Sequence, residues 1–310
     1  MPRTLQLKGT DRAAYLATLF FACLILAITA LLVSQLWIGS YAARVKFGFG
    51  FLTSSLWNPV TSEFGALPFL YGTVITSFVA LLISVPLGIG AAIFLAELAS
   101  TRLSNSLTFL VELLAAVPSV IYGLLAIFTL VPFMQSTLGP FLQSFLGWSP
   151  LFDGPIYGVG YLTAALVLSV MMFPFIISVS REALLAVPRE QREAALALGA
   201  TQWESTFQIV LPYAKLGIFG SVFLGLARAL GETMAVTMVI GNDPKLHASL
   251  FDQGYTIAAV IANEFTEASN DTHLASLVLL GLVLFGLTML INAFARIMIS
   301  LTTAKGSRKA

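Results

Sequence analysis

Five long stretches of the chain contain no charged residue, and they define the architecture that the sequence predicts. They cover residues 13–43, 64–96, 113–152, 154–180 and 274–295, which are 31, 33, 40, 27 and 22 residues long. A helix needs roughly 20 apolar residues to cross a hydrocarbon core about 30 Å thick. Because lipid offers no partner to backbone N–H and C=O groups, each stretch is expected to be helical.

A sixth span is expected near residues 216–241, which are apolar except for Arg228 and Glu232. The 40-residue run is too long for one span, and the glycines and prolines of its second half predict a loop. Pro118 is expected to kink the third span without ending it. The sequence thus predicts an all-α membrane protein with spans at about 14–38, 69–96, 109–132, 157–180, 216–241 and 274–299.

Basic residues are distributed unequally between the two sides of these spans. Twelve lie on the side of the termini: Arg3, Lys8, Arg12, Arg102, Arg181, Arg189, Arg192, Lys215, Arg296, Lys305, Arg308 and Lys309. Three lie on the other side: Arg44, Lys46 and Lys245. Because positive charge is retained in the cytoplasm, both termini are predicted to be cytoplasmic.

The composition excludes several other classes of protein. The chain is 58% hydrophobic and 10% charged, with a mean hydropathy of +0.91, whereas soluble domains have about 25% charged residues. None of the six lysines has the glycine-rich context of a phosphate-binding loop. His247 and His273 are expected to be solvated loop residues without clustered partners, so the sequence predicts no metal site and no ATP site in this chain.

The segment between the fourth and fifth spans, residues 181–212, contains residues typical of helix starts and helix ends. Pro188 suits the first position of a helix, and Gly199 is typical of a helix end. Thr201 and Glu204 have the spacing of a capping box that opens a second short helix. The segment is therefore expected to form a helical elbow, which either docks against another protein or lies on lipid headgroups.

This segment resembles the EAA loop of ABC importer permeases. The resemblance rests on fixed positions at fixed spacing: Glu193, Ala194, Ala195, Gly199, Ile209, Leu211 and Pro212. It implies a helix that couples the membrane part to a separate ATP-binding subunit, with Glu193, Ala194, Ala195 and Gly199 as coupling residues. It also implies a multi-pass protein of the bacterial inner membrane.

Arg228 and Glu232 are two opposite charges within one predicted span. Each such residue costs about 2.5–3.5 kcal/mol at the centre of a membrane helix on insertion scales. Their i, i+4 spacing in a predicted helix places them on one face, where they can pair. One interpretation is a structural ion pair, and the other is a polar pathway in which the Arg228 guanidinium binds a tetrahedral oxyanion.

Longer stretches resemble the PstC-type permease subunits of phosphate ABC transporters: residues 66–97, 112–132 and 228–236. The resemblance implies a type I ABC importer permease fold and a role for Arg228 and Glu232 in phosphate passage. It further implies four kinds of partner: a second permease subunit of the PstA type, a PstB-type dimer that binds ATP, a periplasmic PstS-type phosphate-binding protein and membrane lipid. No enzymatic activity, cofactor or nucleic acid is expected for this chain.

Four further residues are candidates for lining the pathway: Thr73, Thr76, Ser119 and Tyr122. Close helix packing through small and hydroxyl side chains is the alternative for the two threonines. The expected organisation is a cytoplasmic segment at 1–13, a first span and periplasmic loop at 14–66, a core domain at 67–303 with the coupling loop at 181–213, and a tail at 304–310.

Other classes of function remain open from the residues alone. A permease for sulfate, molybdate or an amino acid would have the same EAA loop. An ion-driven secondary transporter would show inverted sequence halves, and none stands out here. A membrane-embedded enzyme would need nucleophile, base or metal groups clustered at one depth, and no such cluster is evident.

Overall fold

The structure is a computed structural model that describes residues 9–268 and 270–306. It contains six helices long and apolar enough to cross a membrane, which agrees with the predicted number. They cover Arg12–Gly39, Leu67–Leu98, Ser119–Leu146, Tyr161–Leu185, Gln202–Gly231 and Asp271–Ile297. Arg3, Lys8, Arg308 and Lys309, together with parts of the predicted end segments 1–13 and 304–310, lie outside the described residues.

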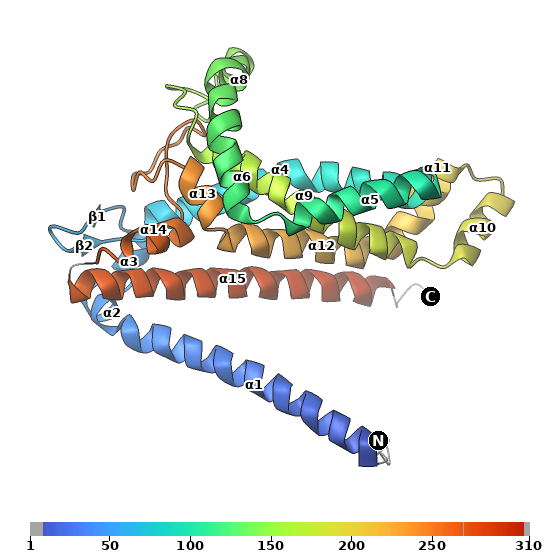
Figure 1. The fold of residues 1–310 in the computed structure, drawn as a ribbon, viewed down its shortest axis with the longest axis horizontal. Helices are drawn as coiled ribbons and strands as arrows, with labels where there is room; N and C mark the ends of the chain where they lie inside the picture. Colours follow the sequence, from blue (N-terminus) through green and yellow to red (C-terminus); the bar gives the residue numbers. More distant parts are fainter. Residues whose placement is uncertain (1–8, 269, 307–310) are drawn as a thin grey trace.

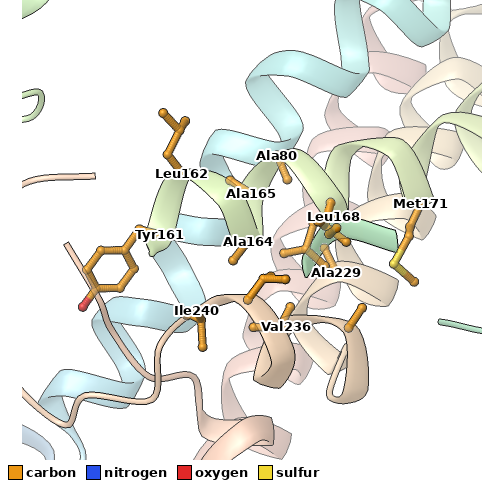
Figure 2. Close-up of a cluster of buried hydrophobic side chains, with 14 of the residues drawn as sticks. Ala80, Tyr161, Leu162, Ala164, Ala165, Leu168, Met171, Ala229, Val236 and Ile240 are labelled. Atoms are coloured by element: carbon orange, nitrogen blue, oxygen red, sulfur yellow. The ribbon is translucent and has the colours of Figure 1, made fainter. Parts of the chain in front are cut away.

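Three helices form the centre of the molecule: α4 (Leu67–Ile93), α9 (Tyr161–Leu185) and α12 (Leu211–Gly231). The largest cluster of buried side chains lies where they meet, and Figure 2 shows small residues such as Ala80 and Ala229 on the facing helices. Small side chains let helix backbones approach closely in a membrane. Packing at these helix crossings therefore positions the end of α12, where Arg228 lies.

The first span is almost free of this bundle. Helix α1 (Gly9–Gly39) is exposed along most of its length. It approaches α15 (Asp271–Gly306) only near the C-terminal end of α1, and the two helices diverge from there (Figure 1). Helices α2 (Tyr41–Phe47) and α3 (Gly50–Thr53) follow and turn the chain back. Helix α1 begins, and α15 ends, at the end of the molecule that carries α10 (Figure 1).

A short antiparallel hairpin and a helix lie at the opposite end of the molecule (Figure 1). Strand β1 (Trp57–Asn58) pairs with β2 (Glu63–Phe64), with Trp57 opposite Phe64. Helix α14 (Ile257–Glu264) packs beside them, against α4 and α15. Together these elements cover the end of the bundle that is remote from α10.

The third span differs from the prediction of residues 109–132. Helix α5 (Thr101–Ala116) is separate, because Val117 and Pro118 have extended backbone, with ψ of 128° and 141°. A residue before proline is pushed out of the helical region. The helix therefore ends here, and the change is more than a kink. The span itself runs from Ser119 to Leu146 and rises steeply from the other spans (Figure 1).

The expected loop after residue 132 is helical as well. The span continues from α6 (Ser119–Leu125) through α7 (Val131–Phe133) and α8 (Gly139–Leu146), with a π-helical segment between each pair. Pro132 and Pro140 each follow such a segment by two residues. A π turn shifts the backbone hydrogen bonds by one residue, so the missing proline N–H interrupts the helix less than it would in a regular α-helix.

The fifth span also has boundaries different from the predicted 216–241. It begins with α11 (Gln202–Ser205), continues through a π-helical segment into α12 and ends at Gly231. Pro212 follows the π turn inside this continuous helix, so the helix passes through the proline without a break. Glu232 has extended backbone, with ψ of 126°, and α13 (Met234–Val239) starts a new short helix.

Candidate functional site

Arg228 lies in the last turn of α12, half-buried, with its guanidinium over the ring of Phe175 on α9. The guanidinium carbon is 4.4 Å from the ring centroid. Its Nε is buried and has no hydrogen-bond partner, and no ion pair to Arg228 exists among the described residues. A permanent positive charge is therefore kept at membrane depth without a carboxylate within ion-pair distance among the described residues.

The predicted Arg228–Glu232 pair is wrong for this conformation. The i, i+4 argument requires both residues in one helix, and α12 ends at Gly231. Glu232 is half-buried, and its Oε1 accepts a hydrogen bond of 3.3 Å from the backbone N–H of Ala235. The carboxylate thus satisfies a backbone donor in the first turn of α13, as capping groups do.

Tyr122 on α6 lies close to this region. Helix α6 packs closely against α13 at Gly123: a Cβ at this position would lie only 3.1 Å from the Cα of Ala235. The Tyr122 hydroxyl donates a hydrogen bond of 2.8 Å to the carbonyl of Leu114. Tyr122 also lines a groove of about 190 Å³ between α6 and α9, and Ser119 is half-buried one turn before it.

Thr73 and Thr76 lie elsewhere, buried in the packing of α4. Their hydroxyls donate to the carbonyls of Phe69 and Gly72, and the Thr73 hydroxyl accepts from the N–H of Ile257 at 3.0 Å. Thr73 thus joins α4 to the start of α14, whereas Thr76 bonds only within α4. The structure therefore brings Arg228, Glu232 and Tyr122 into one region but does not bring the two threonines there.

The segment after α9 forms the expected elbow. Helix α10 (Arg189–Ala197) starts directly after Pro188, which precedes its first turn, and Gly199 follows with φ of +89°. Thr201 and Glu204 form the predicted capping box, with both reciprocal hydrogen bonds present. Figure 1 shows the elbow projecting from one end of the bundle.

The side chains of the four predicted coupling residues differ in exposure. Glu193 and Ala194 are exposed, and so is Gly199 at the turn. Ala195 is only 4% exposed and packs inward, while its carbonyl accepts from the N–H of Ala200 at 3.1 Å. Glu193 and Ala194 are thus exposed to solvent in this chain, whereas Ala195 is buried.

A profile of the family described as "binding-protein-dependent transport system inner membrane component" matches residues 84–302, more than half of the chain. The chain belongs to this family. It is therefore a multi-pass permease component of an ABC transporter in the inner membrane, and its membrane setting agrees with the six apolar helices.

Relatives with a curated name are similar over nearly the whole permease. The phosphate transport system permease protein PstC of Mesorhizobium japonicum is 50% identical over 294 residues, covering 94% of this chain and 90% of the relative. PstC of Pasteurella multocida is 44% identical over 296 residues, covering 94% and 92%. PstC 2 of Mycobacterium tuberculosis is 42% identical over 254 residues, covering 79% and 78%.

Solved structures support the fold. A bacterial ABC transporter for import of the acidic polysaccharide alginate matches with a TM-score of 0.59 at 18% identity, covering 93% of this chain and 99% of that one. An inward-facing MetNI methionine ABC transporter matches with a TM-score of 0.52 at 20% identity, covering 77% and 94%. The permease therefore has the predicted type I ABC importer fold.

An ion pair that the sequence analysis missed ties the coupling segment to the second span. Arg192 on α10 forms a forked contact with Glu97, with Nη2–Oε1 at 2.8 Å and Nε–Oε2 at 3.3 Å. The two residues are 95 positions apart, so no helical spacing connects them. Glu97 stands within the stretch that carries the family resemblance, which was the only signal in the sequence.

His247 and His273 are less solvated than expected and have partners. His273 is 4% exposed in the first turn of α15, and its Nε2 lies 3.0 Å from Oε2 of Glu264, which also accepts from Trp57 Nε1 at 2.9 Å. His247 lies 3.5 Å from a carboxylate oxygen of Asp243 and 3.7 Å from one of Asp252. Both therefore have acidic partners. Within residues 9–268 and 270–306, however, no group of three or more His, Cys, Asp or Glu residues could hold a metal ion.

Proposed function

We propose that this chain is the permease subunit of an ATP-driven importer that moves inorganic phosphate across the bacterial inner membrane. The observation that carries the proposal is Arg228, a charge at membrane depth that no acidic residue neutralises in the described chain. The relatives named as phosphate permeases, at 42–50% identity, support phosphate as the anion.

In this proposal Arg228 binds the travelling anion. Stacking on Phe175 occupies the face of the guanidinium and leaves its in-plane N–H donors for a tetrahedral oxyanion. Arginine binds such anions through two parallel hydrogen bonds. Glu232, held by the amide of Ala235, adds a negative charge nearby that weakens the anion's binding and helps it leave.

Tyr122 and Ser119 at the start of α6 are proposed to line the same pathway, which a second permease subunit of the PstA type completes. The exposed residues Glu193 and Ala194 dock into an ATP-binding dimer of the PstB type. A periplasmic PstS-type protein delivers phosphate to the opposite end, so both termini and the coupling segment face the cytoplasm. ATP binds to the partner, and this chain has no enzymatic activity and no cofactor of its own.

The test is ATP hydrolysis by the purified complex in lipid, measured with a panel of solutes and the binding protein. Phosphate should stimulate hydrolysis, while sulfate, molybdate and amino acids should not. Because a guanidinium binds any tetrahedral oxyanion, stimulation by sulfate or molybdate alone would replace phosphate by that anion. Uptake of phosphate by this chain in the absence of any ATPase subunit would favour an ion-driven secondary transporter.

A further inference from the structure

Polar contacts from four structural elements meet at Glu97 and its partner Arg192, at the end of the second span. Glu97 lies in the π-helical segment Phe94–Leu98, which continues α4. Its side chain is 8% exposed and that of its partner Arg192 is 19% exposed. A forked arginine–carboxylate contact fixes direction as well as distance. The coupling helix α10 and the end of the second span are thus held in one relative orientation.

Arg192 also binds the end of α9. Its Nη2 donates 2.7 Å to the carbonyl of Leu184, and its Nη1 donates to the carbonyl of Val187. These carbonyls lie at a helix C-terminus, where backbone acceptors are left without partners and a positive charge is favourable. One guanidinium therefore links the ends of the second and fourth spans to α10.

The start of the fifth span joins the same point. Gln202, the first residue of α11, donates from Nε2 to the backbone carbonyl of Glu97 at 2.6 Å. Leu184 and Val187 also belong to an apolar cluster with residues of α4, α12 and the π-helical segment before α12: Ala92, Ile93, Val210, Ala214 and Ile218. The polar contacts and this cluster connect three spans to the coupling segment.

The opposite side of the segment is open. Glu193, Ala194 and Leu198 are exposed, and Leu198 is 90% exposed. The second and fifth spans each contain a π-helical segment next to the contact, Phe94–Leu98 and Thr206–Val210. Such segments are frequent at functional sites in helices. The contacts between α10 and the bundle thus lie beside the π-helical segments of both spans.

From this geometry we propose that Glu97 and Arg192 are positioning residues that transmit nucleotide-driven movement of α10 to the membrane spans. The inference rests on the proposed docking of an ATPase at this segment, but it does not depend on which solute is carried. In this proposal the pair acts through its contacts within the chain and binds neither the anion nor the nucleotide. Its role is to make the ends of the second and fourth spans follow α10.

The test uses the complete complex with its ATPase, without phosphate or binding protein. A reporter cysteine replaces Lys245, an exposed residue of the connection between α13 and α14. Figure 1 shows this connection at the end remote from α10. Exposed Cys23 is replaced by serine. The rate of alkylation of the reporter is compared with and without a non-hydrolysable ATP analogue. Two variants are compared: Glu97→Gln, and the double variant Glu97→Met with Arg192→Met, which leaves no buried charge unpaired. Arg102→Gln, at an exposed position on α5, is the matched control.

We expect both variants to retain the ATPase subunits. The change in alkylation rate that the ATP analogue causes should be about 10-fold smaller than in the parent, which is within the usual range for coupling between sites. The control should respond as the parent does. A double variant that assembles and responds fully would overturn the proposal, because the pair would then serve stability alone. Loss of the ATPase subunits from both variants would also overturn the proposal, because the pair would then be needed for docking. The proposal would equally be overturned if the alkylation rate of the reporter in the parent complex did not change with the nucleotide. Failure of the phosphate assignment would appear separately, as a normal reporter response with no stimulation by phosphate.

Discussion

The side chain of Ile176 on α9 packs against two glycines, and this packing allows a quantitative prediction. The side chain of Ile176 is fully buried between Gly88 on α4 and Gly225 on α12. A Cβ on Gly88 would lie 2.7 Å from Ile176 Cγ2 and 3.1 Å from its Cβ. A Cβ on Gly225 would come nearest to Met172 Cε, at 3.1 Å, and 3.4 Å from Ile176 Cγ1.

The two glycines should therefore respond differently to alanine. Ile176 is β-branched and stiff, so Gly88→Ala forces a backbone shift and is expected to cost about 1–3 kcal/mol of stability. Met172 is flexible and can move its methyl group. Gly225→Ala should cost less than about 1 kcal/mol, because alanine gains roughly 0.5–1 kcal/mol over glycine inside a helix.

The assay is reversible unfolding of the purified chain in mixed micelles with increasing denaturing detergent. A double-mutant cycle of Gly88→Ala with Ile176→Ala tests the contact itself. Ile176→Ala alone should cost about 2–5 kcal/mol, and the pair should cost less than the sum by about 0.5–3 kcal/mol. Equal costs for the two glycine variants, or strict additivity in the cycle, would refute this account of the packing.

Three further substitutions test local features. Gly199→Ala should destabilise the elbow by about 1–2 kcal/mol, because φ is +89° in open space and only the backbone is strained; hydrogen exchange in α10 should then increase, and unchanged exchange would contradict this. Thr201→Ala removes the capping box and should cost about 1 kcal/mol, seen as faster exchange at the start of α11 but not in α10. His273→Ala leaves Glu264 with Trp57 alone and should cost about 1–3 kcal/mol in the unfolding assay; a neutral result would mean that the contact adds nothing.

The number of spans and the helical elbow were predictable because both depend on local chemistry. Uncharged runs longer than about 20 residues leave few alternatives in lipid. Capping by Thr201 and the turn at Gly199 act within one or two helical turns. Such features require no knowledge of which segments meet in space.

The errors arise where backbone geometry or distant contacts decide. Pro118 breaks the chain, whereas Pro132 and Pro140 are tolerated after π turns, and hydropathy does not distinguish these cases. The end of α12 at Gly231 separates Arg228 from Glu232, although their spacing suits one helix. The Glu97–Arg192 contact joins residues 95 positions apart, which no periodicity indicates.

The most direct test of the central claim is phosphate uptake by proteoliposomes that contain the complex with Arg228→Gln, compared with the unchanged complex and with Arg228→Lys. Glutamine keeps polar N–H donors on a shorter side chain and has no charge, and lysine keeps the charge without the fork. Our account predicts that the glutamine variant assembles and hydrolyses ATP but takes up no phosphate, with the lysine variant intermediate. Uptake by the glutamine variant at the rate of the unchanged complex would contradict the claim that Arg228 binds the transported anion.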